Sequence, residues 1–238
     1  MLLEVAGLTK NFGSIVVADH FDLTIAPGEA VGIIGPNGAG KTTLFNLIAG
    51  SLSPDGGTIR FDGRDLLGQA PQARCRAGLG RTHQIPQPFE KLTVFENLLV
   101  GAVHGRGRTE REAVQSCGEI LASLGLLARA NALAGSLTLL ERKRLEMARA
   151  LATGPKLLLL DEIAGGLTEG ECNELVATIR GIHETGVAIL WIEHVVHALF
   201  AVIDRLVVLN FGRKIAEGAP KEVMQRGEVH QIYIGIEA

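Results

Sequence analysis

The stretch GPNGAGKT at residues 35–42 decides how the rest of this sequence is interpreted. It follows the short apolar run VGII at residues 31–34, and it precedes a helical pattern that Gly50 can end. The stretch matches G-x-x-x-x-G-K-[ST] in full. Glycines permit the turns that point successive backbone N–H groups at one anion, and the positive end of the following helix adds to the attraction. The sequence therefore predicts a phosphate-binding loop.

The residues of this loop and of the turn after it are expected to hold a nucleotide and its metal ion. Lys41 would reach the β- and γ-phosphates, and the hydroxyl of Thr42 would bind Mg²⁺. Because the pattern is long and lies between a predicted strand and a predicted helix, it favours this interpretation over an ordinary glycine-rich turn. The expected nucleotide contacts are Gly35, Pro36, Asn37, Gly38, Ala39, Gly40, Lys41, Thr42 and Thr43.

Two further apolar runs end in residues that suit the same chemistry. LLLLDE at residues 157–162 predicts a buried strand that ends in Asp161, placed to hold Mg²⁺. Glu162 follows at the position of a general base for the attack of water on the γ-phosphate. LWIEHV at residues 190–195 predicts another buried strand, with His194 at its end. By itself, a histidine in such a place is more often structural than catalytic.

Apolar strands alternate with helical patterns along the chain, which predicts an α/β fold with a mainly parallel sheet. From about residue 85 to 151 the pattern is mostly helical, and Thr109 and Glu112 match a capping box before an amphipathic helix. RLVVLNFGRKIAEG at residues 205–218 predicts a hairpin. In parallel sheets, ligands bind at the carboxyl ends of the strands, so the polar ends named above are expected to share one site.

Composition limits the classes of protein that fit. The chain has 238 residues, 47% of them hydrophobic, which is enough for a large core. Its formal net charge of −3 lacks the basic excess of nucleic-acid-binding proteins, so no nucleic-acid partner is expected. The cysteines, Cys75, Cys117 and Cys172, have no metal or disulfide spacing. The N-terminus has no signal-peptide pattern and the most apolar window contains Glu193 and His194, so a soluble, cytoplasmic chain is expected.

The phosphate-binding loop, LLLLDE and IEH, in this order, resemble an ABC-type ATPase cassette over essentially the whole chain. GRTHQIPQPFEKLTVFENLLVGA at residues 80–102 and GRKIAEG at residues 212–218 are similar to the ATP-binding subunit of branched-chain amino acid ABC importers. The resemblance implies one ABC ATPase domain over residues 1–238. That domain would contain a P-loop core with a mainly parallel sheet, an N-terminal antiparallel β-subdomain and a helical subdomain at about residues 85–151.

The resemblance also implies roles for individual residues. Phe12 would stack on adenine, with packing in the core as the alternative. Gln84 would bind Mg²⁺ and link the γ-phosphate site to a transmembrane partner. Glu162 would polarise the attacking water, and His194 would contact the γ-phosphate as a switch histidine. The cofactors implied are ATP and Mg²⁺.

One departure from the family pattern concerns SLTLLERKRLEMARAL at residues 136–151, where the family carries its L-S-G-G-Q signature. Thr138 keeps a hydroxyl at a helix N-terminus and Glu141 completes T-x-x-E, so the helix can still offer N–H groups to an anion. In this family the signature completes the ATP site of the opposite subunit, so Thr138 would contact a partner's ATP. Leu140 adds bulk where the family has glycine, and the carboxylate of Glu141 would repel a phosphate. A self-capped helix without a ligand is the alternative.

Two more segments bear on partners. The turn after Glu162 carries Thr168 where the family often has Asp or Asn, so it offers a hydrogen bond but no charge. Pro88, Phe89 and Phe95 lie in a region that contacts a short helix of the permease in this family. Packing of the helical part against itself explains these apolar residues equally well.

The function implied is ATP hydrolysis that powers an ABC importer for branched-chain amino acids or related small polar solutes. Its partners would be transmembrane permease subunits, a second ATP-binding subunit of the same or a related chain and, indirectly, an extracytoplasmic solute-binding protein. The chain would lie on the inner face of the cell membrane. Two alternatives remain: a cassette of a lipopolysaccharide-type exporter, and a regulatory subunit that binds ATP without hydrolysing it.

Overall fold

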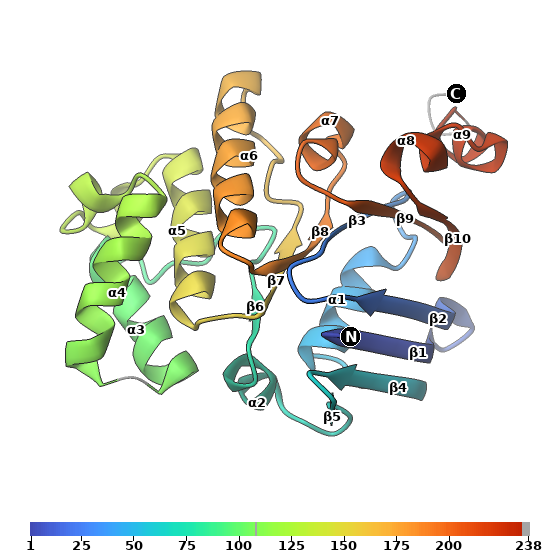
Figure 1. Ribbon diagram of the computed structural model, residues 1–238, viewed down its shortest axis with the longest axis horizontal. Helices are drawn as coiled ribbons and strands as arrows, with labels where there is room; N and C mark the ends of the chain where they lie inside the picture. Colours follow the sequence, from blue (N-terminus) through green and yellow to red (C-terminus); the bar gives the residue numbers. More distant parts are fainter. Residues whose placement is uncertain (108, 235–238) are drawn as a thin grey trace.

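A mainly parallel sheet forms the centre of the molecule (Figure 1). The computed structural model describes residues 1–107 and 109–234. Across the sheet the strands run β10 (Arg213–Gly218), β9 (Arg205–Asn210), β3 (Ala30–Ile34), β8 (Ala188–Ile192), β7 (Leu157–Asp161) and β6 (Leu79–Arg81). All neighbouring pairs are parallel except β10 and β9, which form the expected antiparallel hairpin. The predicted α/β class and the parallel sheet are confirmed.

The strands at the centre of this sheet are apolar because both faces of the sheet are covered. Every residue of β3, β7 and β8 is buried. Strands covered on both sides have continuous apolar runs rather than alternating ones, as AVGII, LLLLD and AILWI do. Polar residues come only at the carboxyl ends of these runs, where Asp161 ends β7 and Glu193 follows β8.

A second, antiparallel sheet covers one side of the core, as the family resemblance implies. It contains β2 (Ile15–Ile25), β1 (Leu3–Phe12), β4 (Gly56–Phe61) and β5 (Arg64–Asp65), in that order. Apolar side chains of its inner face, such as Leu3, Phe21 and Ile59, pack with β3 and with α1 (Lys41–Ala49) in one apolar cluster. This cluster fixes the start of α1 beside β3.

Helices gather at the other end of the molecule (Figure 1). They are α3 (Val94–Arg106), α4 (Glu110–Ser123) and α5 (Leu139–Ala152), with the short 3-10 helices η1 (Leu127–Arg129) and η2 (Ala134–Ser136) between α4 and α5. The helical stretch begins at Val94, because the residues from Thr82 to Thr93 have an irregular backbone. Short helices elsewhere are α2 (Pro71–Arg76), α7 (Val196–Phe200), α8 (Pro220–Met224) and α9 (Gly227–Ile234). None of the helices in the described ranges is both long and apolar enough to cross a membrane.

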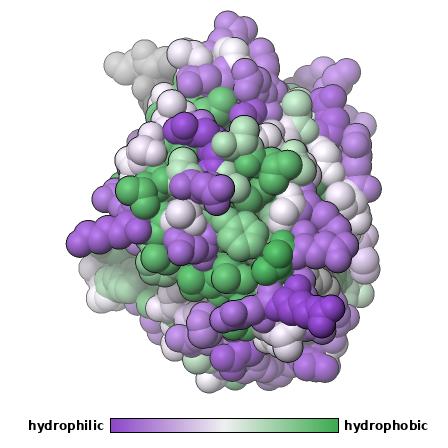
Figure 2. Space-filling model, turned by 90° about the vertical axis from the view of Figure 1, so that its left-hand side faces the viewer, coloured by the Kyte–Doolittle hydropathy of each residue, from purple (hydrophilic) through white to green (hydrophobic). Residues whose placement is uncertain are grey.

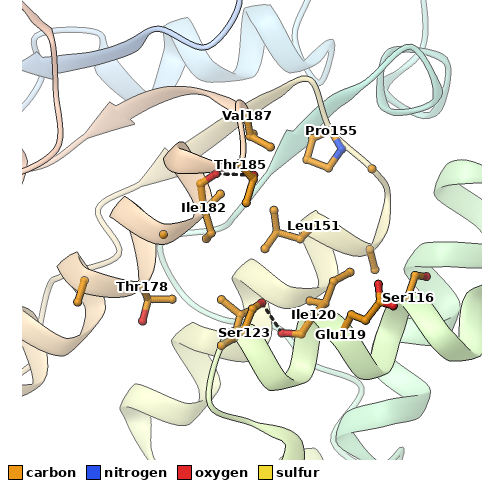
Figure 3. Close-up of a pocket in the computed structure, with 15 residues that line it drawn as sticks. Ser116, Glu119, Ile120, Ser123, Leu151, Pro155, Thr178, Ile182, Thr185 and Val187 are labelled. Carbon is orange, nitrogen blue, oxygen red and sulfur yellow. Dashed lines mark hydrogen bonds between the residues drawn. The ribbon is translucent and has the colours of Figure 1, made fainter.

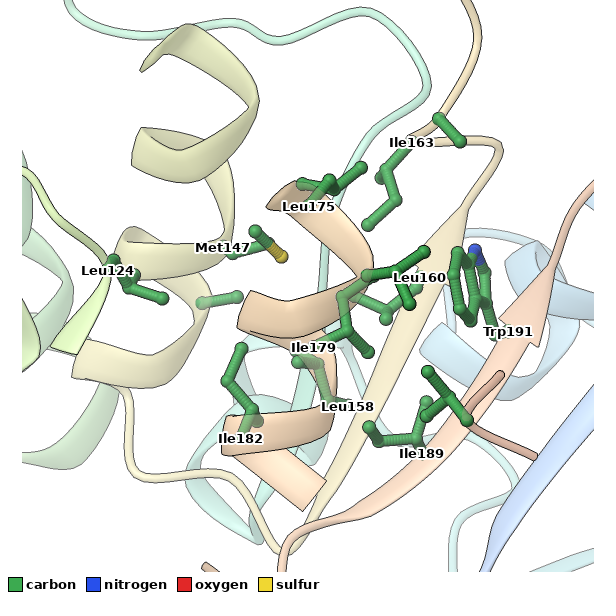
Figure 4. Close-up of a cluster of buried hydrophobic side chains, with 14 of the residues drawn as sticks. Leu124, Met147, Leu158, Leu160, Ile163, Leu175, Ile179, Ile182, Ile189 and Trp191 are labelled. Atoms are coloured by element: carbon green, nitrogen blue, oxygen red, sulfur yellow. The ribbon is translucent and has the colours of Figure 1, made fainter. Parts of the chain in front are cut away.

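Helix α6 (Glu169–Glu184) joins the helical end to the sheet. In Figure 4, its apolar face, which includes Ile179, lies between Met147 of α5 and the side chains Leu158 and Leu160 of β7. Trp191 of β8 extends the same cluster. The buried residues of α6 recur at helical spacing between positions 172 and 182, and they form the face that the helix packs against the core.

Four helices begin with the same reciprocal cap. In each, a threonine hydroxyl accepts from the backbone N–H three residues later, and a glutamate at that position accepts from the backbone N–H of the threonine. The pairs are Thr93 with Glu96, Thr109 with Glu112, Thr138 with Glu141, and Thr168 with Glu171. The two boxes predicted from the sequence, at Thr109 and Thr138, are confirmed.

These caps make stability sensitive to acid. Hydrogen bonds from the backbone N–H and hydroxyl of Thr168 lower the pKa of Glu171 below 4.5, and Thr93 lowers the pKa of Glu96 in the same way. A carboxyl with a lowered folded-state pKa stabilises the fold above its unfolded pKa and loses that contribution as pH falls through the folded value. We expect Glu171→Gln to lower the melting temperature near neutral pH, and we expect its difference from the wild type to shrink as the pH falls below 4.5 through the lowered pKa of Glu171.

Thermal unfolding followed by circular dichroism across this pH range checks the expectation. Glu169→Gln is the matched control, because Glu169 lies in the same first turn of α6 outside the capping box. A constant difference between Glu171→Gln and wild type at every pH would contradict the role of the ionised cap.

Candidate nucleotide-binding and hydrolysis site

The residues expected to bind the phosphates and Mg²⁺ of this chain's own nucleotide meet at one edge of the parallel sheet. The phosphate-binding loop follows β3. Asp161 ends β7 and Glu162 comes directly after it, and His194 follows β8. These three strands are neighbours in the sheet, and their parallel direction brings their carboxyl ends to the same edge. This is the position at which open parallel sheets bind ligands.

Two glycines of the loop occupy places that no other residue fits. A Cβ on Gly35 would lie 2.1 Å from the carbonyl oxygen of Leu209. Gly40 has a φ of +102°, and a Cβ there would lie 2.3 Å from the carbonyl oxygen of Val17. Gly40 is also the N-cap of α1, and neither a capping side chain nor an acidic residue occupies the first turn. The N–H groups at this helix end are therefore left for an anion.

Lys41 lies folded over the loop. Its side chain is buried, with the residue only 5% exposed, and its ammonium donates to the carbonyl oxygens of Gly35 at 2.7 Å and Pro36 at 3.0 Å. Burial lowers the pKa of Lys41, and the nearby charges of Glu162 and Asp161 oppose that shift. A phosphate in the loop would supply the anionic partner that two neutral carbonyl groups now replace.

A cavity of about 290 Å³ lies above the loop, lined by Val17, residues 37–43 and Glu162. Some other hollows of the molecule are larger, but different side chains line them. A cavity of about 570 Å³ lies among α4, α5, α6 and the residues that lead into β7 and β8 (Figure 3). Its lining is mainly apolar and small polar side chains, such as Ile120, Leu151 and Thr178, and none of the predicted nucleotide contacts lines it.

The two carboxylate oxygens of Asp161 differ in their hydrogen bonding. The residue is 2% exposed, and its Oδ2 accepts from Nη2 of Arg81 at 3.1 Å. Its buried Oδ1 has no hydrogen-bond partner in the described part of the chain. Burial raises the pKa of Asp161, while Arg81 lowers it and favours the charged form. A buried, unpaired carboxylate oxygen beside the phosphate-binding loop fits a divalent cation.

Glu162 brings the other two predicted catalytic residues together. One carboxylate oxygen, Oε2, accepts from Nε2 of Gln84 at 2.6 Å, and the other, Oε1, lies 2.9 Å from Nε2 of His194. The backbone of Glu162 has a φ of +47°, a strained value for this residue type, and its N–H donates to the carbonyl oxygen of Ile192 at 2.9 Å. The turn is therefore held against β8 so that the carboxylate faces the loop.

Arg81 is a residue of the site that the sequence analysis missed. It ends β6, which pairs with β7, and its Nη1 also donates to Oδ1 of Asn46 at 2.7 Å. A charged residue at the end of a buried strand, in GRTHQ, is the signal that points to it. Arg81 spans the gap between α1 and Asp161, so it sets which oxygen of Asp161 stays available.

Removing this contact is expected to weaken the binding of Mg²⁺. The quantity to compare is the ratio of the ATP affinity with Mg²⁺ to the ATP affinity without it. In Arg81→Met this ratio should fall about 10-fold, which corresponds to the loss of one hydrogen bond to a charged group. Binding of ATP without Mg²⁺ should be unchanged. Because the pKa of Asp161 would rise further, the loss should grow as the pH is lowered.

Titrations of fluorescent ATP with and without Mg²⁺ at two pH values make this test. Arg60→Met is a suitable control, since Arg60 is exposed and contacts the backbone of Gly63. Equal Mg²⁺ dependence in Arg81→Met and wild type would show that Asp161 needs no help from Arg81.

Phe12 and Thr138 lie outside this cavity. Phe12 is 50% exposed at the end of β1, with the ammonium of Lys10 5.6 Å from its ring centroid, so it is not a core aromatic. Thr138 is the N-cap of α5, where its hydroxyl accepts from the N–H of Glu141. The segment forms the capped helix that both interpretations of the sequence require.

Leu140 and Glu141, the two departures from the family signature, both leave the N-terminal end of α5 uncovered. The side chain of Leu140 is buried in the apolar cluster, so its bulk does not cover the helix end. The carboxylate of Glu141 is engaged by the N–H of Thr138 at 2.9 Å and by Nε of Arg129 at 3.2 Å. Thr168 has the corresponding place at the start of α6.

The irregular segment after Gln84 is fastened to the helices. Asn97 is fully buried, and its side chain exchanges two hydrogen bonds with the backbone of Phe89. The guanidinium of Arg149 lies 5.0 Å from the ring centroid of Phe89 and donates to the carbonyl oxygen of Gln87 at 2.7 Å. Phe89 stays exposed beside a groove of about 310 Å³, whereas Phe95 packs against the core.

Comparisons with known proteins point to one family. Residues 18–165 match the family described as ABC transporter. The chain is 37% identical to the high-affinity branched-chain amino acid transport ATP-binding protein BraF of Pseudomonas aeruginosa, over 98% of both chains. It is 38% identical to the corresponding protein LivG of Escherichia coli K12, again over 98% of both. A crystal structure of the ADP conformation of an ATP-binding cassette superposes with a TM-score of 0.90 at 33% identity, over 98% of both chains.

Proposed function

Because the chain belongs to the ABC transporter family of ATP-binding cassettes, we propose that it hydrolyses ATP to power an importer for branched-chain amino acids or related small polar solutes. The observation that carries this proposal is the carboxylate of Glu162. It borders the cavity above the phosphate-binding loop and is hydrogen-bonded to both Gln84 and His194. A carboxylate in that place can accept the proton of a water molecule that attacks the γ-phosphate.

The surrounding residues have complementary roles in the proposal. Backbone N–H groups of residues 35–43 and the ammonium of Lys41 bind the phosphates. Thr42, Gln84 and the free Oδ1 of Asp161 would hold Mg²⁺, which supplies positive charge against the phosphate oxygens. His194 contacts the γ-phosphate and orients Glu162. Phe12 offers an exposed ring on which adenine can stack.

A second ATP-binding subunit, of the same or a related chain, would complete each site. Thr138 and the first N–H groups of α5 would contact the partner's γ-phosphate in trans. Burial of Leu140 and pairing of Glu141 with Arg129 support this role, because they keep apolar bulk and negative charge away from the helix end. Thr168 stands at the start of α6, next to the turn that carries Glu162.

We also propose that the chain contains a helical subdomain and a docking site for the permease. Residues 94–152 would act as a helical subdomain, because α3, α4 and α5 pack together while α6 joins them to the sheet.

The groove that includes Phe89, Val100 and Arg149 would receive a short helix of the permease on the inner face of the membrane. Figure 2 looks onto the helical end, where apolar side chains gather among hydrophilic ones. Exposed Val114, Leu127 and Leu133 belong to this end.

Reconstitution tests the proposal. The chain, its permease and a solute-binding protein would be placed in lipid vesicles, and uptake of radioactive leucine would be measured together with phosphate release. Uptake that requires both ATP and the solute-binding protein supports the importer. Phosphate release with outward movement of lipid would indicate the exporter, and transport-linked ATP binding without phosphate release would indicate the regulatory subunit.

A further inference from the structure

Glu193 carries a buried carboxylate close to the catalytic candidates Glu162 and His194, and the proposed function gives it no role. Glu193 follows β8 and directly precedes His194, and it is 1% exposed. One oxygen, Oε2, accepts from the backbone N–H of Ala164 at 3.0 Å. The other, Oε1, accepts from the N–H of His194 at 2.9 Å and from that of Val195 at 3.4 Å. Three backbone N–H donors therefore fix the position of this buried carboxylate.

These bonds join two separate segments of the chain. Ala164 lies in the turn that begins with Glu162, and His194 is the residue whose ring contacts the Glu162 carboxylate. Glu193 therefore binds the backbone on both sides of the Glu162–His194 hydrogen bond. The N–H of Glu193 in turn approaches the carbonyl oxygen of Ile33 in β3 at 3.4 Å, so this arrangement is attached to the strand that leads into the phosphate-binding loop.

Lys143 is a second buried ionisable side chain, and Glu193 influences its pKa. Lys143 of α5 is 3% exposed, and the charge of Glu193 acts on it. Burial lowers the pKa of Lys143, and Glu193 raises it. Because an uncompensated buried charge is costly, the two residues are expected to depend on each other. Lys143 belongs to α5, the helix that Thr138 caps.

We propose that Glu193 is a positioning residue for ATP hydrolysis. It holds the turn of Glu162 and the backbone of His194 in the register that lets their side chains meet over the phosphate-binding loop. The inference rests on the proposed ATPase function and adds a residue to it. Glu193 touches neither nucleotide nor water in this role; it acts through Glu162 and His194.

Glu193→Gln is the variant that tests it. The amide keeps one oxygen acceptor but turns an N–H₂ group toward a backbone donor, so one of the two segments is released. ATP hydrolysis by the assembled transporter should fall about 10- to 100-fold, the loss expected for one buried charge-assisted bond. The affinity for Mg-ATP should stay near that of the wild type, because the phosphate-binding loop is unchanged. Glu174→Gln, which removes an exposed partner of Arg144, should hydrolyse ATP normally.

A spectroscopic reading separates positioning from mere stability. The ¹⁵N signal of His194 Nε2, identified by its loss in His194→Ala, should move toward that of a solvent-exposed imidazole in Glu193→Gln. Should Glu193→Gln fail to fold, Lys143→Met combined with Glu193→Gln removes both buried charges and should restore folding while hydrolysis stays low. Normal hydrolysis in any folded variant without the Glu193 carboxylate, or an unmoved His194 signal, would overturn the inference.

The failure of the inference differs from the failure of the proposed function. If the wild-type transporter hydrolyses ATP and Glu162→Gln does not, the function stands and the Glu193 variants decide the inference alone. If the wild type releases no phosphate, the proposed function fails, and the inference that depends on it fails as well.

Discussion

Glu162→Gln is expected to lower the rate of ATP hydrolysis by about 10²- to 10⁴-fold, the range that a positioned general base contributes. A glutamine keeps the length of the side chain and one oxygen that can face His194 at the present 2.9 Å. Its amide nitrogen cannot take a proton from water, and it would meet the amide of Gln84, which now donates to Oε2 at 2.6 Å. Binding of Mg-ATP should persist, because Lys41 and the loop are unaltered.

Phosphate release under saturating Mg-ATP measures the effect, and equilibrium binding of a fluorescent ATP analogue checks that the site still fills. Glu184→Gln, at the exposed end of α6, is a control of the same chemistry. Hydrolysis within a few-fold of the wild type would remove Glu162 from the role of base.

The same variant tests the role of α5, since a site that binds ATP without hydrolysing it should hold two subunits together. Sedimentation velocity with Mg-ATP should then show a dimer, in which Thr138 and the first N–H groups of α5 serve the partner. A persistent monomer with ATP bound would show that α5 requires a different chain opposite it.

Lys41→Met is expected to weaken ATP binding about 100-fold, the upper range for loss of a hydrogen bond between charged groups. The ammonium is already beside the loop, 2.7 Å from the carbonyl oxygen of Gly35, so it needs only a small movement to reach a phosphate. Methionine fills the same space without charge. Because the charges of Glu162 and Asp161 act on Lys41, its loss would also leave two carboxylates facing the incoming phosphates.

Isothermal titration calorimetry with ATP, with and without Mg²⁺, gives the affinity directly. Lys156→Met removes an exposed lysine that pairs with Asp62 at 2.6 Å, and it should bind ATP as the wild type does. Tight binding by Lys41→Met would mean that the phosphates lie elsewhere.

Features with a local cause were predictable from the sequence. The phosphate-binding loop, the runs before Asp161 and His194, and the caps at Thr109 and Thr138 each lie within a few neighbouring residues, where spacing alone specifies geometry. The family resemblance gave Gln84 and Glu162 roles at the same γ-phosphate site, but their hydrogen bond was not predicted, because no spacing along the chain relates residues so far apart.

Features that depend on tertiary packing were missed. Arg81 and Glu193 look like ordinary strand ends in the sequence, and their contacts exist only once β6, β7 and β8 lie side by side. The irregular segment before Val94 has a local reason, since Pro86 and Pro88 disfavour a helix there. The burial of Leu140 in the apolar cluster also depends on tertiary packing, so the sequence alone does not reveal it.

The position of β3 in the sheet has a consequence for the synthesis of this protein on the ribosome. β3 is made early, yet its two neighbours, β8 at Ala188–Ile192 and β9 at Arg205–Asn210, are among the last strands to emerge. Until then the apolar strand AVGII has unpaired edges, which invite association with other chains. Nascent chains stalled before Ala188 should therefore be clients of chaperones and proteases. Hydrolysis of ATP must wait for the second half of the chain, because Glu162 and His194 lie there.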